Sequence, residues 1–318
     1  MNNNRQDPPL GLQGRFHSEA EKEPPILGDL KGIIFDYGGT LDTCGQHWGK
    51  KLWHAYERQH VPVTEQQFRD AYVYGERTLG RNPIIKPDYT FHRTLSTKIR
   101  LEMEHLCTHG AWDASEEEFH AKHQAVLDDL YAEVQATTAH SIGVLRELHE
   151  RYPMVLVSNF YGNIECVLHE FGFDGLFLDI IESAIVGVRK PDPRIFELGV
   201  EALRSSDVET LRRLEVQKLR SLDVEKDATS PQLNSPLDPK GRFRSEAEKE
   251  QLNLSTSQPL NSQDVLVVGD SFYKDILPAQ KAGCRTAWFK GEGWTDETYD
   301  ETIPDMVITD LSDLLVIK

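Results

Sequence analysis

The sequence lacks long hydrophobic runs, and it has few cysteines. No stretch of about 18 consecutive apolar residues occurs, so we expect no membrane-spanning helix. Residues 1–23 lack the apolar segment of a secretory signal peptide, which predicts a cytoplasmic protein. The four cysteines are far apart and form no CxxC pair, so a disulfide framework or a zinc cluster is not expected.

The chain also lacks an excess of positive charge. It has 35 Lys and Arg residues against 52 Asp and Glu residues, and its formal net charge is −17. Such a chain repels a phosphodiester backbone, so nucleic acid is not an expected partner. A phosphorylated small molecule remains compatible with this charge if a lysine or a metal ion supplies positive charge locally. The apolar fraction of 39% is that of an ordinary globular protein.

The segment GIIFDYGGTLD at 32–42 is the first candidate for a site. The apolar run at 33–35 is typical of a strand buried on both faces. Asp36 follows it directly, at the end of the strand where α/β sheets bind ligands. Gly38 and Gly39 allow a tight turn whose N–H groups can face an anion. A plain strand with a glycine turn and a capping aspartate explains this segment alone equally well.

The rest of the chain divides into segments of different character. Residues 1–27 are polar and contain four prolines, so we expect disorder there. Residues 47–136 show helical apolar spacing and no strand pattern, which predicts an inserted helical unit. Further strands are predicted at 154–157, 178–181, 265–268, 286–289 and 306–309. Their alternation with helices predicts an α/β fold, a Rossmann-like parallel sheet with helices on both faces, built from 28–46 and 137–318.

One connection is longer than a crossover between two strands of such a sheet requires. Lys190 and Asp270 are 80 positions apart, whereas a helix-linked crossover needs only about thirty residues. The excess at 204–262 is polar and repetitive, and its GRFRSEAEKE repeats the GRFHSEAEKE near the N-terminus with one change. We therefore expect a poorly ordered insertion within the core. A surface helix at about 204–226 is the competing interpretation.

Polar side chains follow the predicted strands in chain order: Asp36, Ser158, Lys190, and Asp270 with Asp275. Each one alone is compatible with a turn or a helix cap. Together they fall where the carboxyl ends of parallel strands gather ligands, which favours a site. Asp36 and Asp270 offer the oxygen ligands that Mg²⁺ prefers. Lys190 and Ser158 can bind phosphoryl oxygens, and lysine and metal together offset the charge of a phosphate.

These segments resemble the four motifs of the haloacid dehalogenase superfamily, which is dominated by phosphatases. DYGGTL resembles its DxDGTL motif, and VLVSNF resembles its strand that ends in Ser or Thr. KPDPRIF matches its lysine motif, and GDSFYKD matches its GDSxxxD motif. The resemblance covers about 28–203 and 263–318. It implies that 47–136 is a helical cap that closes over the substrate.

The resemblance also implies roles for individual residues. Asp36 would be the nucleophile that becomes an aspartyl-phosphate, and Lys190 the catalytic lysine. The implied Mg²⁺ ligands are Asp36, the backbone carbonyl of Gly38, Asp270 and, as an outer or second ligand, Asp275. The implied substrate-binding residues are Ser158, Asn159, Gly39 and Lys190.

One position departs from the family pattern. The family's phosphatases carry a second aspartate two residues after the nucleophile, and this chain has Gly38 there. That aspartate is the general acid and base, a function that contributes about 10²–10⁴-fold in rate. We therefore predict a Mg²⁺-dependent hydrolase of a phosphorylated small molecule with an atypical proton-transfer step, suited to acyl phosphates. Asp42 and His47 are nearby substitutes, although turn stabilisation and the start of a helix are their plainer roles.

Three alternatives remain. A carbon–phosphorus hydrolase of this family also lacks the second aspartate, and uses a cap lysine that forms an imine. The candidate lysines are Lys50, Lys51, Lys86 and Lys98. A dehalogenase is disfavoured because those relatives need no metal, whereas Asp270 and Asp275 are both retained. A non-catalytic protein that binds a phosphoryl group or a partner is favoured by Gly38 and disfavoured by Asp36.

Overall fold

The computed structural model describes residues 30–205, 260–295 and 298–317. The N-terminal segment 1–27, most of the insertion at 204–262 and the competing helix at 204–226 therefore lie outside the described residues, apart from the short ends of the insertion. Within the described part of the chain, no helix is both long and apolar enough to cross a bilayer.

The described residues form a central sheet and a set of helices. The strands are β1 (Gly32–Phe35), β2 (Met154–Ser158), β3 (Asp179–Glu182), β4 (Val265–Gly269), β5 (Arg285–Phe289) and β6 (Met306–Ile308). The helices are α1 (Trp48–Arg58), α2 (Glu65–Arg81), α3 (Phe91–Thr108), α4 (Glu116–His149), α5 (Ile164–Phe171), α6 (Ser183–Val186), a helix over 194–205, and α9 (Leu277–Lys281). Three short turns of helix are η1 (Ser262–Asp264), η2 (Phe272–Ile276) and η3 (Leu311–Val316). Each predicted strand occurs, with its ends shifted by at most one residue.

The sheet is parallel throughout, in the order β3-β2-β1-β4-β5-β6. Successive residues of β1 face opposite sides: Ile33 and Phe35 pack in the core formed with α4 and α5, and Ile34 packs in the core formed with the helix over 194–205 and α9. Both faces are thus covered by helices, which explains why the inner strands are apolar without alternation. The predicted Rossmann-like fold is confirmed.

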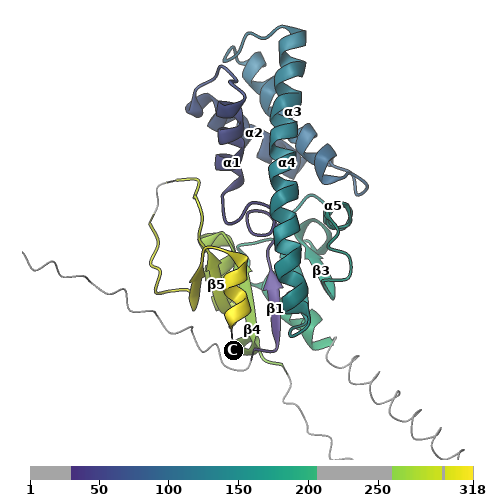
Figure 1. Ribbon diagram of the computed structural model, residues 1–318, viewed down its shortest axis with the longest axis vertical. Helices are drawn as coiled ribbons and strands as arrows, with labels where there is room; N and C mark the ends of the chain where they lie inside the picture. The colour runs from purple at the N-terminus through teal and green to yellow at the C-terminus, as the bar shows by residue number, and fades with distance from the viewer. Residues whose placement is uncertain (1–29, 206–259, 296–297, 318) are drawn as a thin grey trace, which may run out of the picture.

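A unit made only of helices is inserted between β1 and β2. Residues 48–149 contain α1, α2, α3 and α4 and no strand, as predicted. Thr64 and Ser115 begin α2 and α4, because each hydroxyl accepts a hydrogen bond from the third helical N–H. α4 continues without a break through residue 136, where we placed the end of the cap, and runs down beside β1 (Figure 1). We call α1, α2, α3 and the first half of α4 the helical unit.

Candidate active site

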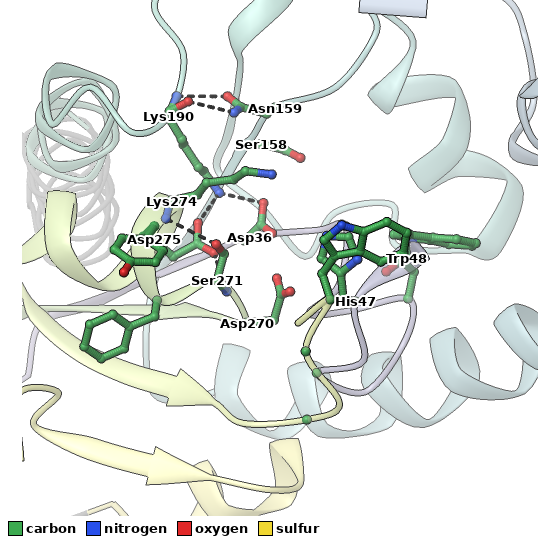
Figure 2. A pocket seen from close by; sticks show the side chains of 18 of the residues that line it. Asp36, His47, Trp48, Ser158, Asn159, Lys190, Asp270, Ser271, Lys274 and Asp275 are labelled. Atoms are coloured by element: carbon green, nitrogen blue, oxygen red, sulfur yellow. Dashed lines mark hydrogen bonds and ion pairs between the residues drawn. The ribbon is translucent and has the colours of Figure 1, made fainter. Parts of the chain in front are cut away.

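Three neighbouring strands bring polar side chains to one edge of the sheet. Asp36 directly follows β1, Ser158 ends β2, and Asp270 directly follows β4. Because β1 lies between β2 and β4, these three residues must lie side by side. Lys190 reaches the same place from the loop after α6, and Figure 2 shows its ammonium group between Asp36 and Asp275. The predicted convergence of these strand ends is thus present in the fold.

The Lys190 ammonium group holds two carboxylates together. Its Nζ lies 2.6 Å from Asp36 Oδ1 and 2.7 Å from Asp275 Oδ1, and all three side chains are buried. These are short, charge-assisted contacts. Burial alone would lower the pKa of Lys190, but the charges of Asp275 and Asp36 raise it above its ordinary value. Lys190 is therefore a fixed positive charge at the site.

The site has three carboxylates, and the Lys190 ammonium group contacts two of them. Carboxylate oxygens of Asp36, Asp270 and Asp275 lie within 4.8 Å of one another. Burial raises the pKa of Asp36 to about 6 despite the Lys190 contact. Burial and the charges of Asp275 and Asp36 also raise the pKa of Asp270. Such a cluster of oxygen donors with excess negative charge fits a hard divalent cation such as Mg²⁺.

The turn after β1 requires glycine at one position. Gly39 has a φ of 100°, and a Cβ on it would lie 2.4 Å from the Asp270 carboxylate. Its N–H donates to Asp42 Oδ1 at 2.7 Å, and Trp48 Nε1 donates to Asp42 Oδ2 at 2.9 Å. Asp42 thus stabilises the turn, which was its plainer predicted role. Burial raises the pKa of Asp42 to about 7, although these two hydrogen bonds oppose the rise.

His47 also takes the plainer of its two predicted roles. It is the N-cap of α1, and its Nδ1 accepts a hydrogen bond from Gly49 N at 3.0 Å. Burial, and then the charge of Lys274, lowers the pKa of His47 to about 4, so the ring is neutral at pH 7. His47 and Asp42 nevertheless both line the cavity described below.

Asn159 contacts Lys190 through the backbone rather than through its ammonium group. Asn159 Nδ2 donates to Lys190 O at 3.1 Å, and Lys190 N donates to Asn159 Oδ1 at 3.0 Å. These bonds fasten the Lys190 loop to the end of β2. Ser158 is buried and lines the cavity, with its side chain on the same side as Asp36 (Figure 2).

A cavity of about 570 Å³ lies over these residues. Its upper wall comes from the helical unit and includes Lys98, one of the four candidate lysines, together with Glu76, which the sequence did not indicate. Lys98 Nζ lies 2.5 Å from Glu76 Oε1, and the Tyr161 hydroxyl donates to the same oxygen at 3.1 Å. The four lysines considered for imine formation are all described, and among them only Lys98 lines this cavity.

The loop after β5 joins the core to the helical unit beside the cavity. His47 N donates to Glu292 O at 2.9 Å, and Arg69 Nη2 donates to Trp294 O at 3.0 Å. The Trp294 ring lies so close to Gly49 that a Cβ there would be 2.0 Å from it. Any larger residue at position 49 would displace this contact.

The fold and the site define a Rossmann-like α/β protein whose lysine and carboxylates meet at the sheet edge under an inserted helical unit. A family model described as haloacid dehalogenase-like hydrolase matches residues 30–211, and a second, described as HAD-hydrolase-like, matches 241–314. The chain therefore belongs to the haloacid dehalogenase-like hydrolases. No curated protein matches it.

Solved structures of this family are distant relatives. The putative HAD-hydrolase YfnB from Bacillus subtilis, bound to magnesium, is 15% identical with a TM-score of 0.45, over 90% of this chain and 97% of that one. A predicted phosphoglycolate phosphatase from Haemophilus somnus is 17% identical with a TM-score of 0.42, over 91% and 97%. An HAD phosphatase from Thermococcus onnurineus is 17% identical with a TM-score of 0.41, over 90% and 96%.

Proposed function

We propose that this protein is a Mg²⁺-dependent hydrolase of phosphorylated small molecules that uses Asp36 as its nucleophile. The observation that supports this most directly is the Lys190 ammonium group held between Asp36 and Asp275, beside Asp270, whose pKa is raised by burial and by the charges of Asp275 and Asp36. A phosphoryl group that approaches Asp36 meets a fixed positive charge rather than bare carboxylates. This arrangement suits electrostatic stabilisation of a phosphoryl transition state.

The metal site would be formed by Asp36, Asp270, the backbone carbonyl of Gly38 and, as an outer or second ligand, Asp275. When bound, Mg²⁺ would neutralise charge on the phosphoryl oxygens. Both carboxylate oxygens of Asp275 already have partners, because Lys190 Nζ contacts Oδ1 and Ser271 N donates a hydrogen bond to Oδ2 at 3.0 Å. This favours an outer position for Asp275.

The proposed reaction has two steps, and both take place at the Asp36 carboxylate. In the first, the Asp36 carboxylate attacks phosphorus, the bond between phosphorus and the leaving group breaks, and an aspartyl-phosphate forms. In the second, water attacks phosphorus, the bond between phosphorus and the Asp36 oxygen breaks, both protons of the water remain on the departing dihydrogen phosphate, and the Asp36 carboxylate is regenerated. Lys190 and the Ser158 hydroxyl bind the phosphoryl oxygens in both steps. Asn159 positions Lys190 through the two backbone hydrogen bonds.

The leaving group receives little help from general acids. Both carboxylate oxygens of Asp42 accept hydrogen bonds, from Gly39 N and from Trp48 Nε1. His47 is held neutral, with one ring nitrogen bonded to Gly49 N. Asp42 is thus held in the turn and His47 caps α1, so in this proposal neither takes the place of the aspartate that is absent at Gly38. We therefore propose substrates with leaving groups that need no strong protonation, such as acyl phosphates.

The test is a screen of phosphorylated metabolites, with acetyl phosphate included, in the presence of Mg²⁺ and in EDTA. Asp36→Asn keeps the side-chain shape and should abolish turnover without unfolding the protein. Asp113→Asn, at an exposed position in the loop between α3 and α4, is the matched control. Acid quenching followed by mass spectrometry should find one phosphate on the peptide that contains Asp36. Substantial turnover by Asp36→Asn would contradict the covalent mechanism.

A second candidate is cleavage of a carbon–phosphorus bond, and the position of Lys98 in the cavity favours it. Imine formation requires an unprotonated amine. Lys98 Nζ is instead held in an ion pair with Glu76 Oε1 at 2.5 Å, and this contact counts against the candidate. Borohydride reduction in the presence of a carbonyl-containing phosphonate would trap Lys98 if the second candidate is right. Without trapping, and with ester or anhydride turnover, the first candidate stands.

A further inference from the structure

Most charged side chains around the cavity are already paired. Lys190 contacts Asp36 and Asp275, Lys98 contacts Glu76, and Lys290 contacts Glu301. Lys274 is different. Within the described parts of the chain its ammonium group makes no hydrogen bond or ion pair, although the residue lines the cavity.

The position of Lys274 is fixed by its neighbours in η2. Its N–H donates to Ser271 Oγ at 3.2 Å, and the next residue, Asp275, is fastened by Lys190 and by Ser271 N. Figure 2 shows its side chain extending over the site toward Asp36 and Ser158. The Lys274 backbone is thus held by hydrogen bonds, and its exposed side chain lines the cavity.

Lys274 and Lys98 line the same cavity, Lys274 from the core and Lys98 from α3. Beyond the effect of burial, the positive charges of Lys274 and Lys98 both lower the pKa of His47, and both charges act on Glu76. The Tyr72 ring lies 4.7 Å from Lys98 Nζ and gives this space an apolar wall. The leaving group of a substrate bound at Asp36 must occupy it.

We propose that Lys274 binds a carboxylate on the leaving group, so that the substrates are phosphate esters or acyl phosphates whose leaving group carries one carboxylate. This inference rests on the proposed phosphatase function and names its substrate class. Among the described residues that line the cavity, Lys98, Lys190 and Lys290 each contact a carboxylate, whereas the positive charge of Lys274 has no such contact. A single carboxylate balances that charge, whereas a second phosphate would bring excess negative charge close to Glu76.

The test compares substrates that differ only in this charge. Para-carboxyphenyl phosphate and para-carbamoylphenyl phosphate have similar shapes, and their phenol leaving groups need little protonation; the meta isomers repeat the comparison in a second geometry. A charge-assisted hydrogen bond predicts that kcat/KM favours the carboxylate by about tenfold or more. Lys274→Met should reduce this ratio to near one, and Lys274→Arg should retain most of it. Lys290→Met makes the same charge change in the same cavity and should keep the ratio.

Two outcomes would overturn the inference. The first is a wild-type enzyme that turns over both substrates without preference. The second is a Lys274→Met variant that loses activity equally on both, since Lys274 would then contact the phosphoryl group. Calorimetric binding of para-hydroxybenzoate against para-hydroxybenzamide provides a readout without turnover. Carboxylate binding that depends on Lys274, in a protein that hydrolyses no phosphate compound, would support the Lys274 subsite and contradict the proposed function.

Discussion

The indole edge of Trp48 lies beside Gly38, and a Cβ on Gly38 would be 3.9 Å from Trp48 Nε1. That is an ordinary van der Waals distance, and Gly38 is not among the glycines with a positive φ angle. Gly39 is the opposite case, because its φ angle and the Asp270 carboxylate both exclude a side chain. Nothing in the backbone therefore forbids an aspartate at position 38.

Gly38→Asp should raise the hydrolysis of unactivated alkyl phosphates. The new carboxyl group points into the cavity near Trp48 and can protonate the leaving oxygen. We expect kcat to rise by roughly 10²-fold for alkyl phosphates, whose leaving groups depend on protonation, and to change little for acetyl phosphate. Steady-state kinetics on both substrates, with Mg²⁺ present, measure the difference.

Gly38→Ala is the matched control, because it fills the same space without an acid and should give no gain. Efficient alkyl phosphate hydrolysis by the wild type would show that another residue transfers the proton, with Asp42 and His47 first to be tested. A folded Gly38→Asp variant that binds Mg²⁺ but remains inert to every phosphate ester would favour the carbon–phosphorus or binding alternatives.

The part of the site that lies on the sheet could be predicted from the sequence. Asp36, Ser158 and Asp270 each follow an apolar run, and a parallel sheet necessarily aligns the ends of such strands. The upper wall of the cavity could not be predicted. Glu76 and Tyr161 meet only because the helical unit docks on the core, and no spacing within either segment reflects that contact.

The same distinction applies to the helices. The starts of α2 and α4 could be predicted, because Thr64 and Ser115 carry local capping signals. No helix end marks the predicted boundary of the cap at residue 136, because α4 continues past it with buried apolar residues from Val134 to Leu145. The direction of the Lys274 side chain also depends on the turn geometry of η2, which no sequence pattern specifies.

Asp270→Asn should stabilise the metal-free protein and remove its response to Mg²⁺. The variant loses a carboxylate that Asp275 and Asp36 repel, so we expect unfolding in EDTA to cost about 1 kcal/mol more than in the wild type. The wild type should gain about 2.7 kcal/mol at a Mg²⁺ concentration one hundred times its dissociation constant, and the variant should gain little. Thermal unfolding with and without Mg²⁺ measures both effects, with Asp113→Asn as the control. An undiminished Mg²⁺ response would remove Asp270 from the metal site.

Replacing residues 206–259 with a short glycine–serine linker should leave the core intact. The described ends of the chain on either side are adjacent, because Arg204 Nε donates to Leu260 O at 2.8 Å. Shortening a connection changes its closure entropy by only about 0.6 kcal/mol per halving. We expect a Tm within about 5 °C of the wild type and unchanged activity. Leu260→Ser, which disturbs a buried leucine in full-length protein, is the destabilised reference, and a deletion variant that melts as low would refute the prediction.

Glu102 makes the stability of the helical unit depend on pH. It is fully buried; Oε2 accepts a hydrogen bond from the Tyr56 hydroxyl at 3.3 Å, and Oε1 has no partner among the described residues. Burial raises the pKa of Glu102 from 4.5 to about 8, although Lys98 opposes the rise. Between these two values the folded protein binds a proton that the unfolded chain releases. The free energy of unfolding should therefore fall as pH rises, by at most about 1.4 kcal/mol per pH unit for this one group.

Glu102→Gln should remove this contribution, because the amide has the shape of the protonated acid and does not titrate. The variant and the wild type should have similar free energies of unfolding at pH 5, and the variant should be more stable by roughly 4 kcal/mol at pH 9, because the slope acts over about three pH units between pH 5 and the folded-state pKa of about 8. Urea unfolding at a series of pH values gives the difference directly. Glu104→Gln changes the charge of an exposed glutamate on the same helix and should leave the wild-type slope unaltered. If Glu102→Gln keeps that slope as well, the pH dependence arises elsewhere and the carboxyl group of Glu102 is ionised in the folded protein.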